Sequence, residues 1–249
     1  MSEPYVSLRV DRDGPVAEVV LRGPGKGNAM GTDFWREIPL VFRALDADDE
    51  VRVVVLRGDG ETFCTGLDVN AMATELGPLV MGENFAKERR TLLELIRRWQ
   101  EALTLIEQCR KPVIAAIRGW CIGGGVDLIT ACDIRVAARE AKFSVREVRM
   151  GIVADVGTLQ RLPRIVGQGW ARQLTLTGED FDAAKAQQIG LVTELYDHAD
   201  CLDRARDLAK RIAANACELR ERMATRSPLF TPRPASPFAS RLQIRSNSA

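Results

Sequence analysis

The sequence predicts an α/β protein with one substantial core. Short runs rich in β-branched residues, bounded by glycine, indicate buried strands at Val16–Leu21, Val51–Leu56 and Val113–Ile117. Stretches between these runs repeat apolar residues every three or four positions, which indicates amphipathic helices. Of the 249 residues, 46% are hydrophobic and 28% are charged, a composition typical of a globular chain that can bury one large core. Strands that alternate with helices are typical of α/β folds.

The first half of the chain carries two predicted helices. Thr32 is suited to cap the first, and Pro39 should kink or interrupt it, because proline lacks an amide hydrogen and clashes with the preceding turn. The apolar face of this helix consists of Phe34, Ile38, Val41, Phe42 and Leu45. The second helix, Lys87–Cys109, is long, and the proline at position 112 prevents it from continuing.

The second half begins with alternating elements and then becomes mainly helical. Glycines at positions 123–125 open a short helix that reaches about Ala131, and Ile134–Ala137 is extended. The later elements are helices at Trp170–Thr177, Asp182–Ile189 and Leu202–Ala214 and a short strand at Val192–Leu195. We divide the chain into a core at 1–195, a helical C-terminal segment at 196–217 and an atypical tail at 218–249. The tail contains many prolines and arginines, so we expect it to be basic and poorly ordered.

Charge and composition exclude several classes of function. The formal net charge is +1, so no global field attracts nucleic acid or an anionic membrane. No apolar run is long enough to span a bilayer, and the N-terminus lacks the apolar segment of a signal peptide, so we expect a cytoplasmic protein. The six cysteines form no Cys-x-x-Cys pair and His198 is the single histidine, which argues against a metal site and against a serine–histidine triad. Carboxylate side chains and backbone dipoles are therefore the remaining candidates for catalytic groups.

Two glycine-containing segments are candidates for an oxyanion hole. The glycines at 123–125 place bare N–H groups at the positive end of a helix, and Gly124 is the donor that we select. The hexapeptide at 63–68 (FCTGLD) follows a strand and can turn the Thr65 N–H toward the same point. As an alternative, the glycines form a close-packed turn and the hexapeptide is a strand-to-helix connection capped by Asp68.

Three acids are candidates for proton transfer. Asp127 lies in the first turn of the helix that the glycines open, where the helix dipole favours a carboxylate. Glu147 lies between two arginines, and Asp155 precedes a further helix. Each acid also suits a structural role, because Asp127 and Asp155 can cap helices and Glu147 can form a surface ion pair of little energetic value.

Together these motifs resemble the crotonase superfamily. The resemblance rests on four segments and runs from about Val16 to Ala214; the segments are CIGGGVDL at 121–128, ACDIR at 131–135, GNAM at 27–30 and the hexapeptide at 63–68. It implies a spiral of repeated ββα units with a mainly helical C-terminal part, and homotrimers that often pair into hexamers. From about Ala216 the chain departs from the C-terminal helices of the family. A catalytically silent acyl-CoA-binding subunit is therefore one alternative.

Within that superfamily, the segment that follows Glu147 is similar to Δ3,5-Δ2,4-dienoyl-CoA isomerases. Hydratases have glutamates at the positions of Asp127 and Glu147, whereas these isomerases have an aspartate at the position of Asp155. The resemblance therefore implies an isomerase that converts 3,5-dienoyl-CoA into 2,4-dienoyl-CoA, with an enoyl-CoA hydratase as the alternative enzyme. The isomerisation removes a proton at C2 and delivers one at C6, and two separate carboxyl groups can divide this work.

The resemblance also implies roles for individual residues. The thioester oxygen would lie between the Thr65 and Gly124 N–H groups. Glu147 would remove the C2 proton, Asp155 would protonate C6 and Asp127 would orient both, although the sequence equally allows Glu147 and Asp155 to exchange roles. No metal is expected, and no cofactor beyond the CoA of the substrate. The candidate substrate- and CoA-binding residues are Arg22, Lys26, Asn28, Ala29, Cys64, Thr65, Gly66, Asp68, Gly123 and Gly124.

Overall fold

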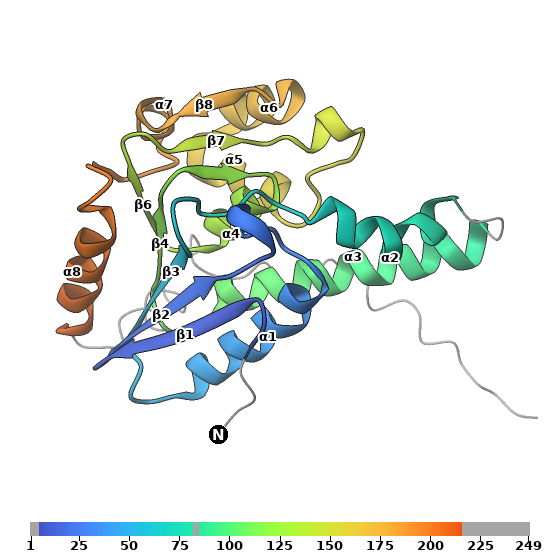
Figure 1. Ribbon diagram of the computed structural model, residues 1–249. Helices are drawn as coiled ribbons and strands as arrows, with labels where there is room; N and C mark the ends of the chain where they lie inside the picture. The colour runs from blue at the N-terminus through green and yellow to red at the C-terminus, as the bar shows by residue number, and fades with distance from the viewer. Residues whose placement is uncertain (1–4, 82–84, 216–249) are drawn as a thin grey trace, which may run out of the picture. The chain divides into compact units, whose positions relative to one another are not determined.

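The computed structural model describes residues 5–81 and 85–215 (Figure 1). One compact unit, Met1–Cys217, contains both the expected core and the expected helical C-terminal segment. The tail at 218–249, for which the sequence predicts a basic and poorly ordered chain, lies outside the described residues.

Two sheets organise the described chain. The larger has the strand order β1-β2-β3-β4-β6-β9, in which β1 pairs antiparallel with β2 and all other neighbours are parallel. Its strands are β1 (Leu8–Asp13), β2 (Val16–Leu21), β3 (Val53–Gly58), β4 (Val113–Ile117), β6 (Ile134–Ala138) and β9 (Glu194–Tyr196). The smaller sheet, with the order β5-β7-β8, consists of β5 (Trp120–Ile122), β7 (Lys142–Ser144) and β8 (Asp180–Asp182). This mixed α/β architecture is the predicted fold class.

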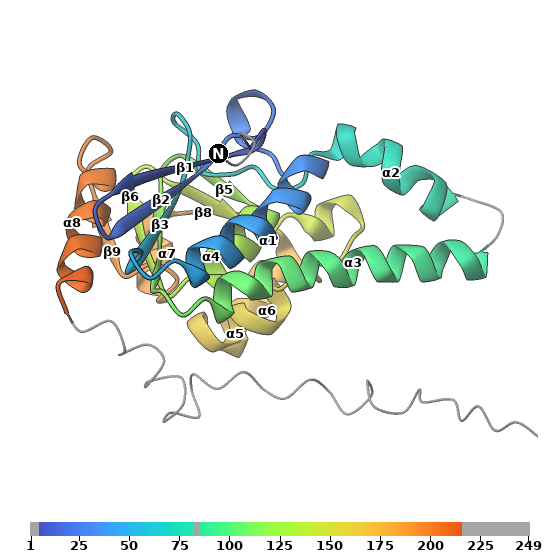
Figure 2. The same cartoon turned by 90° about the horizontal axis from the view of Figure 1, so that it is seen from below.

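Helices connect and cover the strands. They are α1 (Thr32–Ala47), α2 (Val69–Met81), α3 (Phe85–Gln108), α4 (Gly124–Ala131), α5 (Thr158–Val166), α6 (Gln168–Thr177), α7 (Ala183–Gln188) and α8 (Cys201–Ala213), with the 3-10 turns η1 (Gly25–Gly27) and η2 (Glu147–Met150). Figure 2 shows α2 beside the N-terminal half of α3, where both project away from the sheets. In the part of the chain that the structure describes, no helix is both long enough and apolar enough to cross a bilayer.

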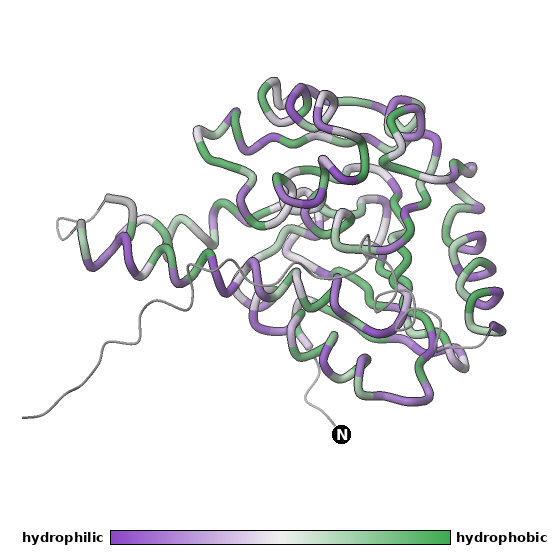
Figure 3. The backbone as a smooth tube through the Cα atoms, turned by 180° about the vertical axis from the view of Figure 1, so that it is seen from behind, coloured by the Kyte–Doolittle hydropathy of each residue, from purple (hydrophilic) through white to green (hydrophobic). Residues whose placement is uncertain are grey.

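Alternation along β3 divides the buried interior into two layers. Val53 and Val55 belong to the cluster that packs under α8, whereas Val54 and Leu56 belong to the main core with α1 and α3. Figure 3 shows hydrophobic residues along the central strands and a mixture of hydrophilic and hydrophobic residues along α8. Because helices cover both faces of the larger sheet, its inner strands are apolar on both sides, as their sequences predict.

Several local predictions need correction. α1 continues through Pro39, because a fully buried apolar face holds the helix against the core despite the missing amide hydrogen. Thr32 is the first residue of α1 rather than its cap; Gly31 takes that position without a side-chain hydrogen bond. The strand predicted to start at Val51 starts at Val53. The sequence pattern also fails to indicate β1, α2 and the three strands of the smaller sheet. Each strand of the smaller sheet has three residues, which is too short to show a period.

Candidate active site

The two glycine-containing segments pack backbone against backbone. The Cys64 N–H donates to the Trp120 carbonyl at 3.0 Å, and the Ile122 N–H donates to the Cys64 carbonyl at 2.9 Å. Gly66 has a φ of +87°, and a Cβ at this position would lie 2.9 Å from the Ile122 carbonyl oxygen and 3.2 Å from the Gly124 nitrogen. Gly66 therefore allows the hexapeptide to approach the N-terminus of α4 closely.

The GNAM segment at 27–30 holds the hexapeptide from its other side. The Thr65 N–H donates to the Gly27 carbonyl at 2.8 Å, and the Met30 N–H donates to the Gly66 carbonyl at 2.8 Å. Since the Thr65 N–H is engaged in this contact, its expected role as an oxyanion donor needs correction. Among the described residues no acceptor lies within reach of the Leu67 N–H or of the Gly124 N–H. The donor pair that the geometry offers is therefore Leu67 and Gly124.

Glu147 turns inward from η2 instead of forming the surface ion pair that its neighbours allow. Arg146 and Arg149 pair with Asp180 instead. The Oε1 atom of Glu147 lies 3.3 Å from the position of a Cβ on Gly123, beside the start of α4. Its Oε2 atom is buried and has no hydrogen-bond partner. Burial, followed by repulsion from Asp127, raises the pKa of Glu147 to about 7.

Asp127 is buried in the first turn of α4, with 2% of its surface exposed. Its Oδ1 atom accepts a hydrogen bond of 2.5 Å from the Thr158 backbone N–H at the start of α5. Burial raises the pKa of Asp127 to about 6, although the Thr158 hydrogen bond and the positive charge of Arg161 act in the opposite direction. Asp127 therefore stabilises the N-terminus of α5 and keeps a carboxyl group inside the cluster.

Asp155 lies half-buried in the loop between η2 and α5. It is not the cap of α5, because Gly157 occupies that position. Its backbone carbonyl accepts a hydrogen bond of 2.7 Å from the Gln100 side chain on α3. Burial raises the pKa of Asp155, and the charge of Asp155 in turn raises the pKa values of Asp127 and Glu147. The three acids thus form one electrostatically interacting cluster.

The other candidate binding residues differ in their environments, and two of them have clear structural roles. Asn28 is buried, and its amide donates to the Thr62 carbonyl at 2.7 Å, so it ties two loops together. Asp68 caps α2, as its alternative role predicts, by accepting the Asn70 and Ala71 N–H groups at 3.1 Å. Cys64 is a fully buried thiol, and Gly123 is the buried cap of α4. Ala29 is half-buried, and Lys26 belongs to η1. Arg22 is exposed, and its Nε atom lies 3.9 Å from the Asp59 carboxylate.

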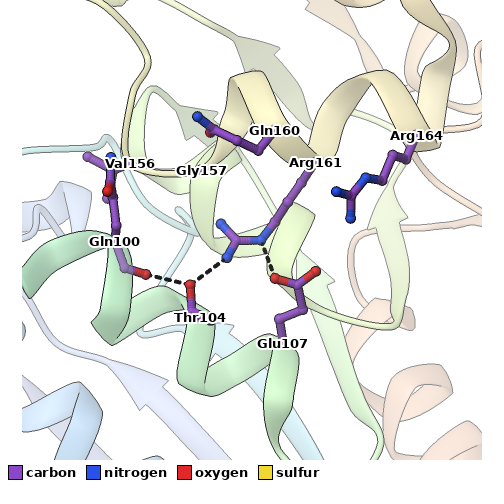
Figure 4. A pocket seen from close by; sticks show the side chains of 8 residues that line it. All are labelled: Gln100, Thr104, Glu107, Val156, Gly157, Gln160, Arg161 and Arg164. Carbon is purple, nitrogen blue, oxygen red and sulfur yellow. Dashed lines mark hydrogen bonds and ion pairs between the residues drawn. The ribbon is translucent and has the colours of Figure 1, made fainter. Parts of the chain in front are cut away.

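A pocket of about 260 Å³ lies between α3 and α5, beside the loop that carries Asp155 (Figure 4). Its lining residues are Gln100, Thr104, Glu107, Val156, Gly157, Gln160, Arg161 and Arg164. None of the three acids is among these lining residues. Gln100 and Arg161 are site residues that sequence reasoning missed. Gln100 shares one face of α3 with Thr104 and Glu107, which follow it by four and seven residues, whereas no local signal in the sequence marks Arg161 on α5.

Comparison with known proteins supports the resemblance. Residues 11–227 match the family model described as Enoyl-CoA hydratase/isomerase. The chain is 44% identical over 218 residues to the mitochondrial Delta(3,5)-Delta(2,4)-dienoyl-CoA isomerase of Dictyostelium discoideum, which covers 85% of this chain and 73% of that protein. The peroxisomal protein of the same name from Arabidopsis thaliana is 44% identical over 204 residues, which covers 81% of this chain and 73% of that protein. The mitochondrial Delta(3,5)-Delta(2,4)-dienoyl-CoA isomerase from Homo sapiens is 44% identical over 216 residues. This aligned region covers 85% of this chain but only 65% of that protein.

Solved structures show the same fold. Pseudomonas aeruginosa DspI matches with a TM-score of 0.80 at 30% identity, over 90% of this chain and 82% of that chain. An enoyl-CoA hydratase from Bacillus anthracis matches with a TM-score of 0.78 at 28% identity, over 91% of this chain and 86% of that chain. Both comparisons confirm the predicted crotonase-like architecture.

One expectation is wrong. The dienoyl-CoA isomerase relatives are named mitochondrial or peroxisomal, which contradicts the cytoplasmic location expected from composition. Composition and hydropathy do not encode an organelle address, because receptors read such addresses from short local segments.

Since the family model matches most of the residues and the dienoyl-CoA isomerase relatives align with most of the chain, the chain belongs to the enoyl-CoA hydratase/isomerase family.

Proposed function

We propose that the protein isomerises 3,5-dienoyl-CoA to 2,4-dienoyl-CoA. The observation that carries this proposal is the arrangement of the three acids around the start of α4. Asp127 accepts the Thr158 N–H at the end of the loop that carries Asp155, and Glu147 Oε1 lies 3.3 Å from the position of a Cβ on Gly123, the cap of α4. Relatives that are 44% identical and named dienoyl-CoA isomerases support the same reaction class. Hydration of a double bond needs two acids, whereas moving a proton between carbons four bonds apart benefits from separate groups at each end.

The N–H groups of Leu67 and Gly124 are the proposed oxyanion hole. Both lack an acceptor among the described residues, and the contact between Gly66 and the Gly124 nitrogen brings the two segments together. Removal of a C2 proton would spread negative charge onto the thioester oxygen. The two N–H groups would bind that oxygen more strongly as its charge grows, and removing one such donor typically costs roughly 3 kcal/mol of transition-state stabilisation.

Glu147 is the proposed base for C2, because its carboxylate lies beside Gly123 and hence beside the thioester end of the site. Asp155 is the proposed acid for C6. The C2–H bond would break toward Glu147, the double bonds would shift by one position each, and a new C6–H bond would form with the proton from Asp155. One proton leaves and one arrives, so the reaction needs no oxidant or reductant. An acyl chain that excludes water from half-buried Asp155 would raise its pKa further and favour its protonated form.

Binding of the CoA group and assembly of the protein are further parts of the proposal. Arg22 is exposed near the Gly23–Gly27 loop, and it is a candidate to hold a phosphate of CoA together with Lys26. No cofactor other than the CoA of the substrate is required. We expect a homotrimer or homohexamer by analogy with the family, which light scattering after gel filtration would measure.

Turnover of a 3,5-dienoyl-CoA, followed by the absorbance of the conjugated 2,4 product, tests this function directly. Glu147→Gln should lose both isomerisation and exchange of the C2 hydrogen with D2O, whereas Asp155→Asn should lose isomerisation but keep exchange and acyl-CoA binding. The opposite exchange pattern would reverse the two roles. Full activity in Asp155→Asn would contradict the function itself. Hydration of crotonyl-CoA in place of isomerisation would identify a hydratase, and binding without either reaction would identify a silent subunit.

A further inference from the structure

Arg161 on α5 is buried between α3 and the cap of its own helix (Figure 4). Its Nε atom donates to Glu107 Oε2 at 2.9 Å, and its Nη2 atom donates to Thr104 Oγ1 at 3.0 Å. Both partners lie one turn apart on α3. A buried arginine with two such partners has a fixed guanidinium plane, so its third nitrogen has a defined position.

That third nitrogen, Nη1, lies over Gly157. A Cβ at Gly157 would be 1.9 Å from Arg161 Nη1 and 3.8 Å from Asp127 Oδ1. The guanidinium and the Asp127 carboxylate therefore both lie beside the position of one missing side chain. Gly157 has a φ of +148°, which L side chains rarely adopt, so its backbone and its contacts both require glycine.

The environment of Asp127 is otherwise negative or neutral. The titratable groups that face it are Glu147 from η2, Asp155 from the following loop, the thiols of Cys64 and Cys121, and Arg161 from α5. Among these described groups Arg161 supplies the positive charge. Glu107 lies on the opposite side of Arg161 and is partly exposed, so it offsets part of that charge.

We propose that Arg161 is a positioning residue for the acid cluster: its guanidinium holds Asp127 in the charged, Thr158-bound form, and Glu107 limits this effect from the other side. The link to catalysis rests on the proposed isomerase function. The charge relationship between these three residues does not, because it is a property of the folded protein without substrate.

Two substitutions should move the titration of Asp127 in opposite directions. Arg161→Gln removes the positive charge and should raise the titration midpoint of Asp127 by roughly one pH unit. Glu107→Gln keeps a side-chain oxygen that accepts from Arg161 but removes the negative charge that offsets the Arg161 guanidinium. The titration midpoint of Asp127 should therefore fall, by less than it rises in Arg161→Gln. The measurement is the carboxyl carbon shift in full-length protein labelled with 13C at aspartate Cγ, assigned by the signal that disappears in Asp127→Asn. Arg164→Gln is the matched control, because Arg164 is exposed on the same helix and lines the same pocket.

The outcomes separate the two proposals. Opposite shifts, with no shift in Arg164→Gln, support the inference whether or not the protein turns over dienoyl-CoA. Absence of a shift in Glu107→Gln, or shifts in the same direction in both variants, would overturn it. If Arg161→Gln does not fold, Arg161→Lys and Glu107→Gln decide the question, since lysine retains the charge and should keep the midpoint near that of the unaltered protein. In an active protein, the pH profile of kcat/KM should shift in the same two directions.

Discussion

The Asp127 carboxylate on α4 accepts a hydrogen bond of 2.5 Å from the backbone N–H of Thr158, the first residue of α5. A carboxylate at a helix N-terminus interacts favourably with the helix dipole. Because the loop that carries Asp155 leads directly into α5, the same contact also fixes the end of that loop. The position of Asp155 therefore depends on the position of Asp127.

Replacing Asp127 by asparagine should shift the titration of Glu147. Burial and then repulsion from Asp127 raise the pKa of Glu147 to about 7, so loss of the Asp127 charge should lower it. The acidic limb of the pH profile of kcat/KM should consequently move to lower pH. Steady-state kinetics between pH 5 and pH 9 measure the limb. A limb that stays in place would show that Asp127 does not act on Glu147 through its charge.

The Gln100 side chain should affect turnover more than folding. It donates a hydrogen bond of 2.7 Å to the carbonyl of Asp155, which anchors the loop to α3. Loss of one such bond costs about 1 kcal/mol, so Gln100→Leu should reduce kcat by roughly fivefold if the anchor matters in the transition state. Gln108→Leu, an exposed change at the end of the same helix, is the control. Equal kinetics in the two variants would remove Gln100 from the site.

Gly66 should be far less tolerant of alanine than Gly60. Both have positive φ, +87° and +68°, so both substitutions should cost about 1–2 kcal/mol of backbone strain. Only at Gly66 would the Cβ meet backbone, 2.9 Å from the Ile122 carbonyl and 3.2 Å from the Gly124 nitrogen. Gly66→Ala should therefore also displace the proposed oxyanion donors and abolish activity. Thermal unfolding and turnover of both variants measure this, and an active, equally stable Gly66→Ala would contradict the backbone contact.

The sequence predicts the chemical types of the site better than its geometry. The strand runs and the acids at 127, 147 and 155 are visible because their signals are local or belong to long motifs. The choice between the Thr65 and Leu67 N–H groups is not visible, because it depends on a hydrogen bond to Gly27, which is distant in the sequence. Similarly, the two arginines beside Glu147 in the sequence predict an ion pair with it, whereas in the structure both arginines pair with Asp180 on β8, which is distant in the sequence.

Glu147 should lower the stability of the folded protein at alkaline pH. Its pKa is raised from an ordinary value near 4.5 to about 7, so folding favours the protonated form. This contribution to stability is present below about pH 4.5 and is lost as the pH rises through 7. Glu147→Gln removes a buried charge whose Oε2 atom has no partner, and it should raise the free energy of unfolding at pH 8 by about 2 kcal/mol. At pH 5 the same variant should differ little from the unaltered protein. Urea unfolding at the two pH values measures the difference, and a gain that is equal at both would mean that packing, rather than ionisation, limits stability at this residue.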